Sequence, residues 1–163
     1  MKSTIRIGLT IGVLCALWQL VMAATGWIVN PRLWNLFYIV ILVEVGVLAW
    51  GLKKTAADHS YAGQFLLGTG ASVIAATFLF LFSMVLMSYL YPGLMSQMKI
   101  LQADSLKQAG QSEAQIAAAV SLQTPLYQAA MGFVGTVVTG ILATLLIGAF
   151  ARRKPRASSS PML

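Results

Sequence analysis

The chain has 163 residues, of which 58% are hydrophobic and 9% are charged, and its formal net charge is +7. A soluble domain carries about 25% charged residues, so this composition cannot cover a water-facing surface and indicates a membrane protein. The basic residues lie between the hydrophobic stretches, whereas most aromatic residues lie within or at the ends of those stretches. This distribution argues against a nucleic-acid-binding surface.

Four segments are apolar over about 20 residues, the length that a helix needs to cross the hydrocarbon core of a bilayer. They are residues 5–27, 33–52, 64–90 and 126–150. The breaks between them carry Pro31, a polar stretch at 53–60, Pro92 and Thr124-Pro125. The sequence therefore predicts an all-α fold, a four-transmembrane-helix bundle that forms a single domain over residues 1–156.

The connection over residues 92–124 is long enough to hold two short helices broken at Gly110. Leu94, Met98 and Leu101 recur at helical spacing in its first half, which predicts one apolar face. Ser112 and Gln115 match a capping box at the start of the second half. We expect a short helical insertion between the third and fourth spans, and a disordered tail over residues 157–163.

The positions of the Lys and Arg residues predict the orientation, because basic residues stay on the cytoplasmic side during insertion. Arg32, Lys99 and Lys107 lie on one side of the predicted membrane. The other basic residues fall on the opposite side: Lys2, Arg6, Lys53, Lys54 and the basic membrane stop formed by Arg152, Arg153, Lys154 and Arg156. Both termini should therefore be cytoplasmic, and the 92–124 insertion should lie outside the cytoplasm.

Small residues recur along three of the predicted spans, and in lipid they allow the close backbone approach that holds helices together. This pattern favours packing within the bundle over a homodimer contact. The predicted packing positions are Gly8 and Gly12 in the first span, Gly68 and Ser72 in the third, and Gly132, Gly135 and Gly140 in the fourth.

Glu44 is the only acid within the spans, and such an acid costs about 2.5 to 3.5 kcal/mol on insertion scales unless it is neutralised or paired. At about 1.5 Å of rise per residue, Gln19, Thr77 and either Thr136 or Thr139 lie at a similar depth. One interpretation is a proton or cation site formed by this intramembrane polar layer. We favour the other, in which a neutral Glu44 carboxyl donates a hydrogen bond to Gln19, because the spans contain no second charged relay.

The remaining reactive residues do not form a recognisable site. Asp58 and His59 are adjacent, but the chain has no second histidine, so we expect no metal site. Cys15 is the single cysteine and lies in an apolar run. We expect no cofactor and no catalytic residue, and hence a protein that is not an enzyme.

The order of several short motifs resembles one family. They are the stretch at 61–68 that leads through Ser72 to Tyr91-Pro92, the stretch at 110–114, Thr124-Pro125, and the stretch at 133–136 before Arg152-Arg153. Over residues 4–154 the chain resembles the bacterial integral-membrane proteins known as domain of unknown function 4199. That resemblance implies four helices in the inner membrane of a bacterium, and it supplies no functional residue.

These features lead to two hypotheses about function. The first is a non-enzymatic structural or accessory component of the inner membrane, whose insertion contacts another membrane protein or a second copy of the chain. The alternative is a small proton- or cation-coupled transporter that uses Glu44. Because four helices enclose little room, such a transporter would act as a homodimer.

Overall fold

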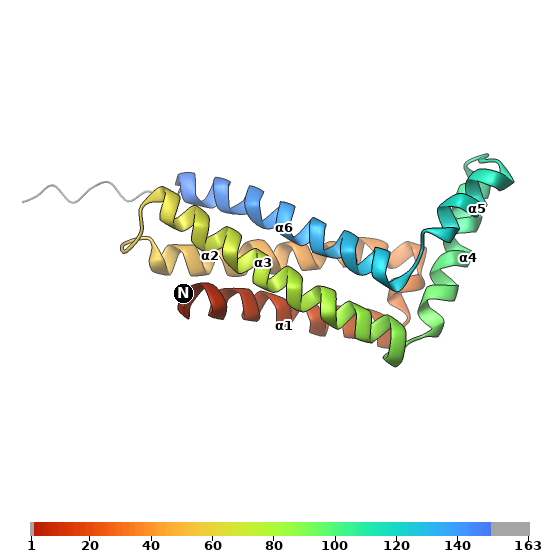
Figure 1. Cartoon of the computed structure of the whole chain (residues 1–163), viewed down its shortest axis with the longest axis horizontal. Helices are drawn as coiled ribbons and strands as arrows, with labels where there is room; N and C mark the ends of the chain where they lie inside the picture. The colour runs from red at the N-terminus through yellow and green to blue at the C-terminus, as the bar shows by residue number, and fades with distance from the viewer. Residues whose placement is uncertain (1, 151–163) are drawn as a thin grey trace, which may run out of the picture.

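The computed structural model describes residues 2–150 of the chain, except for the side chain of Trp34. Every regular element in this range is helical (Figure 1). In chain order the elements are α1 (Lys2–Ala24), η1 (Trp27–Val29), η2 (Pro31–Tyr38), α2 (Ile39–Thr55), α3 (Tyr61–Val85), η3 (Leu86–Leu90), α4 (Gly93–Gln108), α5 (Glu113–Ser121) and α6 (Pro125–Phe150). The predicted all-α, four-helix bundle with a short helical insertion is confirmed.

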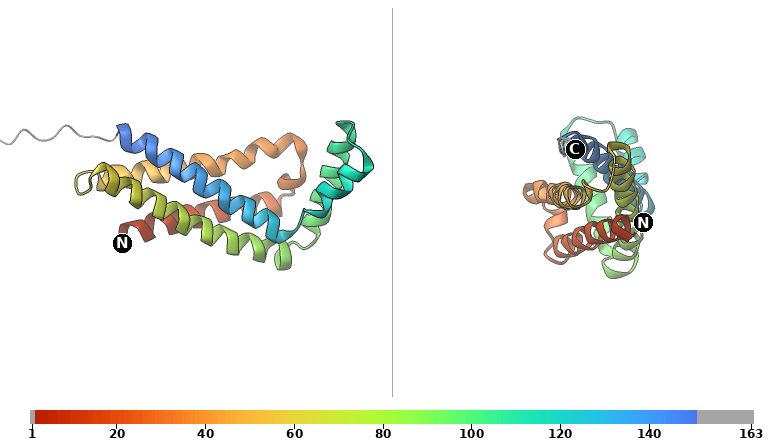
Figure 2. Two further views of the ribbon diagram at one scale, coloured as in Figure 1. Left: turned by 45° about the horizontal axis from the view of Figure 1, so that its top comes forward. Right: turned by 90° about the vertical axis from the view of Figure 1, so that its left-hand side faces the viewer.

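Four helical stretches are long and apolar enough to cross a membrane: Lys2–Ala24, Pro31–Thr55, Tyr61–Leu90 and Pro125–Phe150. Helices α1 and α3 run in one direction along the bundle, and α2 and α6 run in the other (Figure 1). Helix α3 packs mainly against α1 and α6, and α2 packs mainly against the same two helices, so α2 and α3 lie diagonally opposite each other. The end-on view in Figure 2 shows this arrangement.

Local sequence signals explain where the helices begin and end. Gly26 follows α1 with a φ of 72°, which glycine adopts without a steric cost. The Asn30 and Ser60 side chains accept hydrogen bonds from the first turns of η2 and α3. Ser112 and Gln115 form the predicted capping box of α5, and Gly110 turns the chain between α4 and α5 with a φ of 75°.

Two of the four long apolar stretches depart from α-helical geometry at the same end of the bundle. The second begins with the 3₁₀ helix η2, where the Leu36 carbonyl accepts a hydrogen bond from Trp18 Nε1 at 3.0 Å. The third ends in the π-helix η3, where the Tyr91 amide donates to the Leu86 carbonyl at 2.7 Å. Pro92 explains why this helix ends at Leu90, because proline disfavours the α region for the residue before it, Tyr91.

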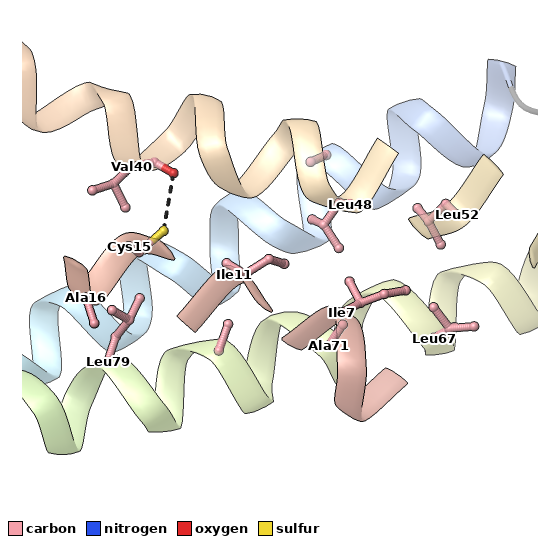
Figure 3. Packing of buried hydrophobic residues seen from close by; sticks show 12 residues of the cluster. Ile7, Ile11, Cys15, Ala16, Val40, Leu48, Leu52, Leu67, Ala71 and Leu79 are labelled. Atoms are coloured by element: carbon pink, nitrogen blue, oxygen red, sulfur yellow. Dashed lines mark hydrogen bonds between the residues drawn. The ribbon is translucent and has the colours of Figure 1, made fainter. Parts of the chain in front are cut away.

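The core runs along the axis between α1, α2 and α3 (Figure 3). Ile7 and Ile11 point from α1 toward Leu48 and Leu52 on α2, and Cys15 points toward Val40. Cys15 Sγ lies 3.8 Å from the Val40 carbonyl oxygen, across the α1 and α2 contact. Many other large apolar side chains point outward, as expected of helices that face lipid.

The α4 and α5 helices form a hairpin at one end of the bundle, opposite the N-terminus and the α2–α3 loop (Figure 1). We call this end the α4 end. Leu94 at the start of α4 is buried in a small cluster with Ala23 and Leu86. Helix α5 contains no buried residue and packs on α4. The hairpin is therefore anchored at the base of α4 and stands clear of the bundle beyond it.

Candidate functional site

Glu44 lies in the middle of α2 and is 2% exposed. It faces the line along which α3 and α6 meet. A Cβ atom placed on Gly140 of α6 would lie 2.8 Å from Glu44 Oε1 and would overlap the Ser72 side chain of α3. The structure thus brings Glu44, Ser72 and Gly140 together from three different helices.

The contact between α3 and α6 follows a four-residue repeat on both helices. Thr144 packs on Gly68, and four residues along each helix Ser72 packs on Gly140. These four residues are all buried, and we call them the α3–α6 seam. In each pair one partner is glycine, so the two backbones approach closely, as small residues allow in helices that pack within lipid.

Polar atoms in the seam have few partners. Within the described residues, Glu44 Oε1, Ser72 Oγ and Thr144 Oγ1 are buried and have no hydrogen bond of good geometry. Buried polar groups of this kind are costly when they stay unpaired. The Ser72 hydroxyl lies beside the Glu44 carboxyl, so a rotation of either side chain pairs the two.

Gln19 does not join Glu44, contrary to the expected pairing. The Gln19 Oε1 atom accepts a hydrogen bond of 3.0 Å from Ser83 Oγ on α3. Because α1 and α3 run parallel, Gln19 meets the end of α3 and not the middle of α2. Counting residues gives the depth of Gln19 along α1, but it does not give the direction in which the Gln19 side chain points.

The threonines of the expected polar layer are also separated. Thr77 is exposed, and its hydroxyl donates to the Val73 carbonyl of its own helix at 2.9 Å, so it needs no partner on another helix. Thr136 is buried on α6, and Thr139 is only half-buried. The layer that surrounds Glu44 is therefore Ser72 and Gly140.

The predicted packing positions fall into three groups. Gly8 lies against Ala71 and Ile74, and Gly12 lies against Phe78, so both bring α1 close to α3. Gly68, Ser72 and Gly140 lie in the seam. Gly132 and Gly135 do not pack: a Cβ atom on either would meet nothing within 4 Å. They lie near the start of α6, on its exposed face.

The other residues considered from the sequence are peripheral. His59 lies beside the Thr55 carbonyl, with Nδ1 at 3.3 Å from the oxygen, in the loop between α2 and α3. No group of three metal-ligating side chains occurs among the residues that the structure describes. The basic stop at Arg152, Arg153, Lys154 and Arg156 and the tail at 157–163 lie outside the described residues.

Gln64 and Ser83 are buried polar residues that the sequence patterns did not single out. Gln64 is four residues before Gly68 and eight before Ser72, so the four-residue repeat of α3 could have identified it. Ser83 follows a long apolar run and carries no such signal.

Four apolar helices around a small-residue seam define a class, the helical bundles whose composition suits a multi-pass membrane protein. Within that class, the chain belongs to the family described as protein of unknown function (DUF4199), whose model matches residues 6–153. No curated protein and no solved structure matches the chain.

Proposed function

We propose that the protein is a non-enzymatic structural or accessory component of a bacterial inner membrane, and that the α4–α5 hairpin is its contact with a partner outside the cytoplasm. The four-helix bundle anchors the hairpin. The partner is another membrane protein or a second copy of the chain.

The distribution of charge supports this orientation. Lys2 and Arg6 begin α1, and Lys53 and Lys54 end α2, so these four residues lie at the same end of the bundle. At the α4 end the described basic residues are Arg32, Lys99 and Lys107. An excess of Lys and Arg near the ends of the spans favours the cytoplasmic side.

The single observation that carries the proposal is the exposure of apolar side chains on the hairpin. Ile100 on α4 is 61% exposed, and Leu122 just after α5 is 58% exposed. A nine-residue helix with no buried residue has little to hold it in isolation. Contact with a partner would cover these side chains and stabilise α5.

The surroundings of Glu44 give less support to a transporter. Glu44 lies against Ser72 and Gly140, and it does not line either of the two cavities found at the α4 end. Transport sites of membrane proteins usually lie at the midplane beside broken helices, whereas η2 and η3 lie at one end of the bundle. We therefore assign Glu44 a role in holding α2 against the seam.

A photocrosslinking amino acid placed at Ile100 or Leu122 tests the proposal in cells of the source bacterium. Leu142 is the matched control, because it is 56% exposed but lies on the middle of α6, where it should face lipid. We expect discrete protein adducts from positions 100 and 122 and none from position 142. The proposal fails if positions 100 and 122 give no protein adduct, or if all three positions give the same products.

A further inference from the structure

A cavity of about 470 Å³ opens into the bundle at its α4 end. Its walls come from α1, η1, η2, α3, η3, α4 and α6. The ribbons of α2 and α6 diverge toward this end (Figure 2). The volume lies within the range of about 300 to 1,000 Å³ that is usual for small-molecule sites.

The two irregular segments of the spans both line this cavity. Asn35, Phe37 and Tyr38 belong to the 3₁₀ helix η2, and Leu86 and Met87 belong to the π-helix η3. Single π-helical turns inside long helices occur frequently at functional sites. The 3₁₀ helix η2 and the π-helix η3 thus lie at the same end of the bundle and line the same cavity.

The lining is uncharged and mainly apolar. Met22, Met87 and Met98 approach it from α1, η3 and α4, and methionine adapts its shape to different apolar ligands. Among the residues that the structure describes, no Lys, Arg, His, Asp or Glu lines it. A charged ligand would therefore lose its hydration without gaining a counter-ion.

One polar group inside the cavity is oriented by a hydrogen bond. Gln19 Oε1 accepts the hydrogen bond from Ser83 Oγ, so the Nε2 group of the same amide is the part of Gln19 that can donate to a ligand. Both residues line the cavity. An oxygen acceptor on a ligand can receive the Nε2 hydrogen bond.

The cavity is open at its side, beside η2 and α6. Phe37 and Tyr38 are 44% and 61% exposed, and Gly132 has open space around its Cβ position. With the proposed membrane placement, on which this inference rests, the opening lies at the outer boundary of the hydrocarbon core. A molecule dissolved in the bilayer can reach it without crossing water.

We propose that this cavity binds one uncharged lipid-like molecule, whose apolar chain contacts the methionines and whose carbonyl or hydroxyl oxygen accepts a hydrogen bond from Gln19 Nε2. The site is separate from Glu44 and the seam. The proposed accessory role requires only a protein partner, and this site would bind a small ligand in addition.

A monoacylglycerol with a diazirine in its acyl chain tests the site on the full-length protein in detergent micelles. After irradiation, mass spectrometry should find the label on peptides that contain Met22, Met87 or Met98. An excess of unlabelled monoacylglycerol should reduce that labelling at least tenfold. Gln19→Leu should weaken the competition about fivefold, the effect of losing one hydrogen bond.

Gly132→Trp should remove the labelling by filling the cavity, and Gly135→Trp is the matched control, because both glycines have open Cβ positions but only Gly132 lines the cavity. Met98→Trp fills the cavity from α4 and replaces Gly132→Trp in the experiment if Gly132→Trp does not fold. Labelling that resists competition, or that persists in both filled variants, overturns the proposal. If the protein inserts in membranes but its labelling resists competition or persists in both filled variants, only this inference is contradicted. If the protein is absent from the membrane fraction, the proposed function is contradicted.

Discussion

Gly140 of α6 lies so close to Ser72 of α3 that any side chain at position 140 would overlap the serine. The Glu44 carboxyl of α2 meets the two residues at the same point. Three of the four long helices are thus held together at one place by a glycine, a serine and an acid. The stability of the bundle should depend on this contact more than on any single apolar side chain that faces outward.

The first prediction concerns the backbone approach at Gly140. Gly140→Ala should lower the free energy of unfolding by about 1 to 3 kcal/mol, because the added methyl group forces α3 and α6 apart. Gly135→Ala, on the same helix but in open space, should stay within about 0.5 kcal/mol of the parent protein. Denaturant titration in mixed micelles measures both. Equal losses in the two variants would show that helix propensity, and not the seam, determines the outcome.

The second prediction concerns the side chain of Glu44. Glu44→Gln keeps the shape and can still donate to Ser72, so it should change the free energy of unfolding by less than about 1 kcal/mol. Glu44→Ala should cost about 2 to 4 kcal/mol, because it leaves a cavity and removes the carboxyl that can pair with the buried Ser72 hydroxyl. The same titration compares the two variants. If Glu44→Gln were as damaging as Glu44→Ala, a carboxyl would be required for more than packing and hydrogen bonding.

The third prediction concerns the hydrogen bond between Ser83 and Gln19. A double-mutant cycle with Ser83→Ala and Gln19→Leu should give a coupling energy of about 0.5 to 1.5 kcal/mol, the range found for hydrogen bonds between membrane helices. Thr77→Ala and Gln19→Leu provide the control cycle, because Thr77 bonds to its own helix. Their coupling should be near zero. The assignment is wrong if the two cycles give equal values.

The sequence predicted the helix count and the insertion because long apolar runs and their Pro and Gly boundaries are local signals. The polar contacts were not predictable in the same way. Residue depth along a helix follows from counting, but the direction of a side chain depends on how the helices are rotated in the bundle. For this reason Glu44 was matched with Gln19, whereas the structure pairs Gln19 with Ser83 and places Glu44 against Ser72.

The rotation of the helices in the bundle also determines which glycines of α6 pack against a neighbour. Gly132, Gly135 and Gly140 share a spacing that suits one packed face, yet only Gly140 packs. The helices α2 and α6 diverge toward the α4 end (Figure 2), and a Cβ atom on Gly132 or Gly135 would meet nothing within 4 Å. The cavity at this end depends on η2 and η3, whose 3₁₀ and π geometry has no clear signal in the sequence.

The placement of the α4–α5 hairpin outside the cytoplasm can be tested directly. The measurement is the reaction of introduced cysteines with a membrane-impermeant maleimide in spheroplasts. Cys15 can remain, because it is fully buried. Asp104→Cys on α4 and Ala57→Cys in the α2–α3 loop both introduce exposed positions at opposite ends of the bundle. We expect position 104 to react in intact spheroplasts and position 57 to react only after lysis. The opposite pattern, or equal reaction at both positions before lysis, would contradict a four-span protein with its α4–α5 hairpin outside the cytoplasm.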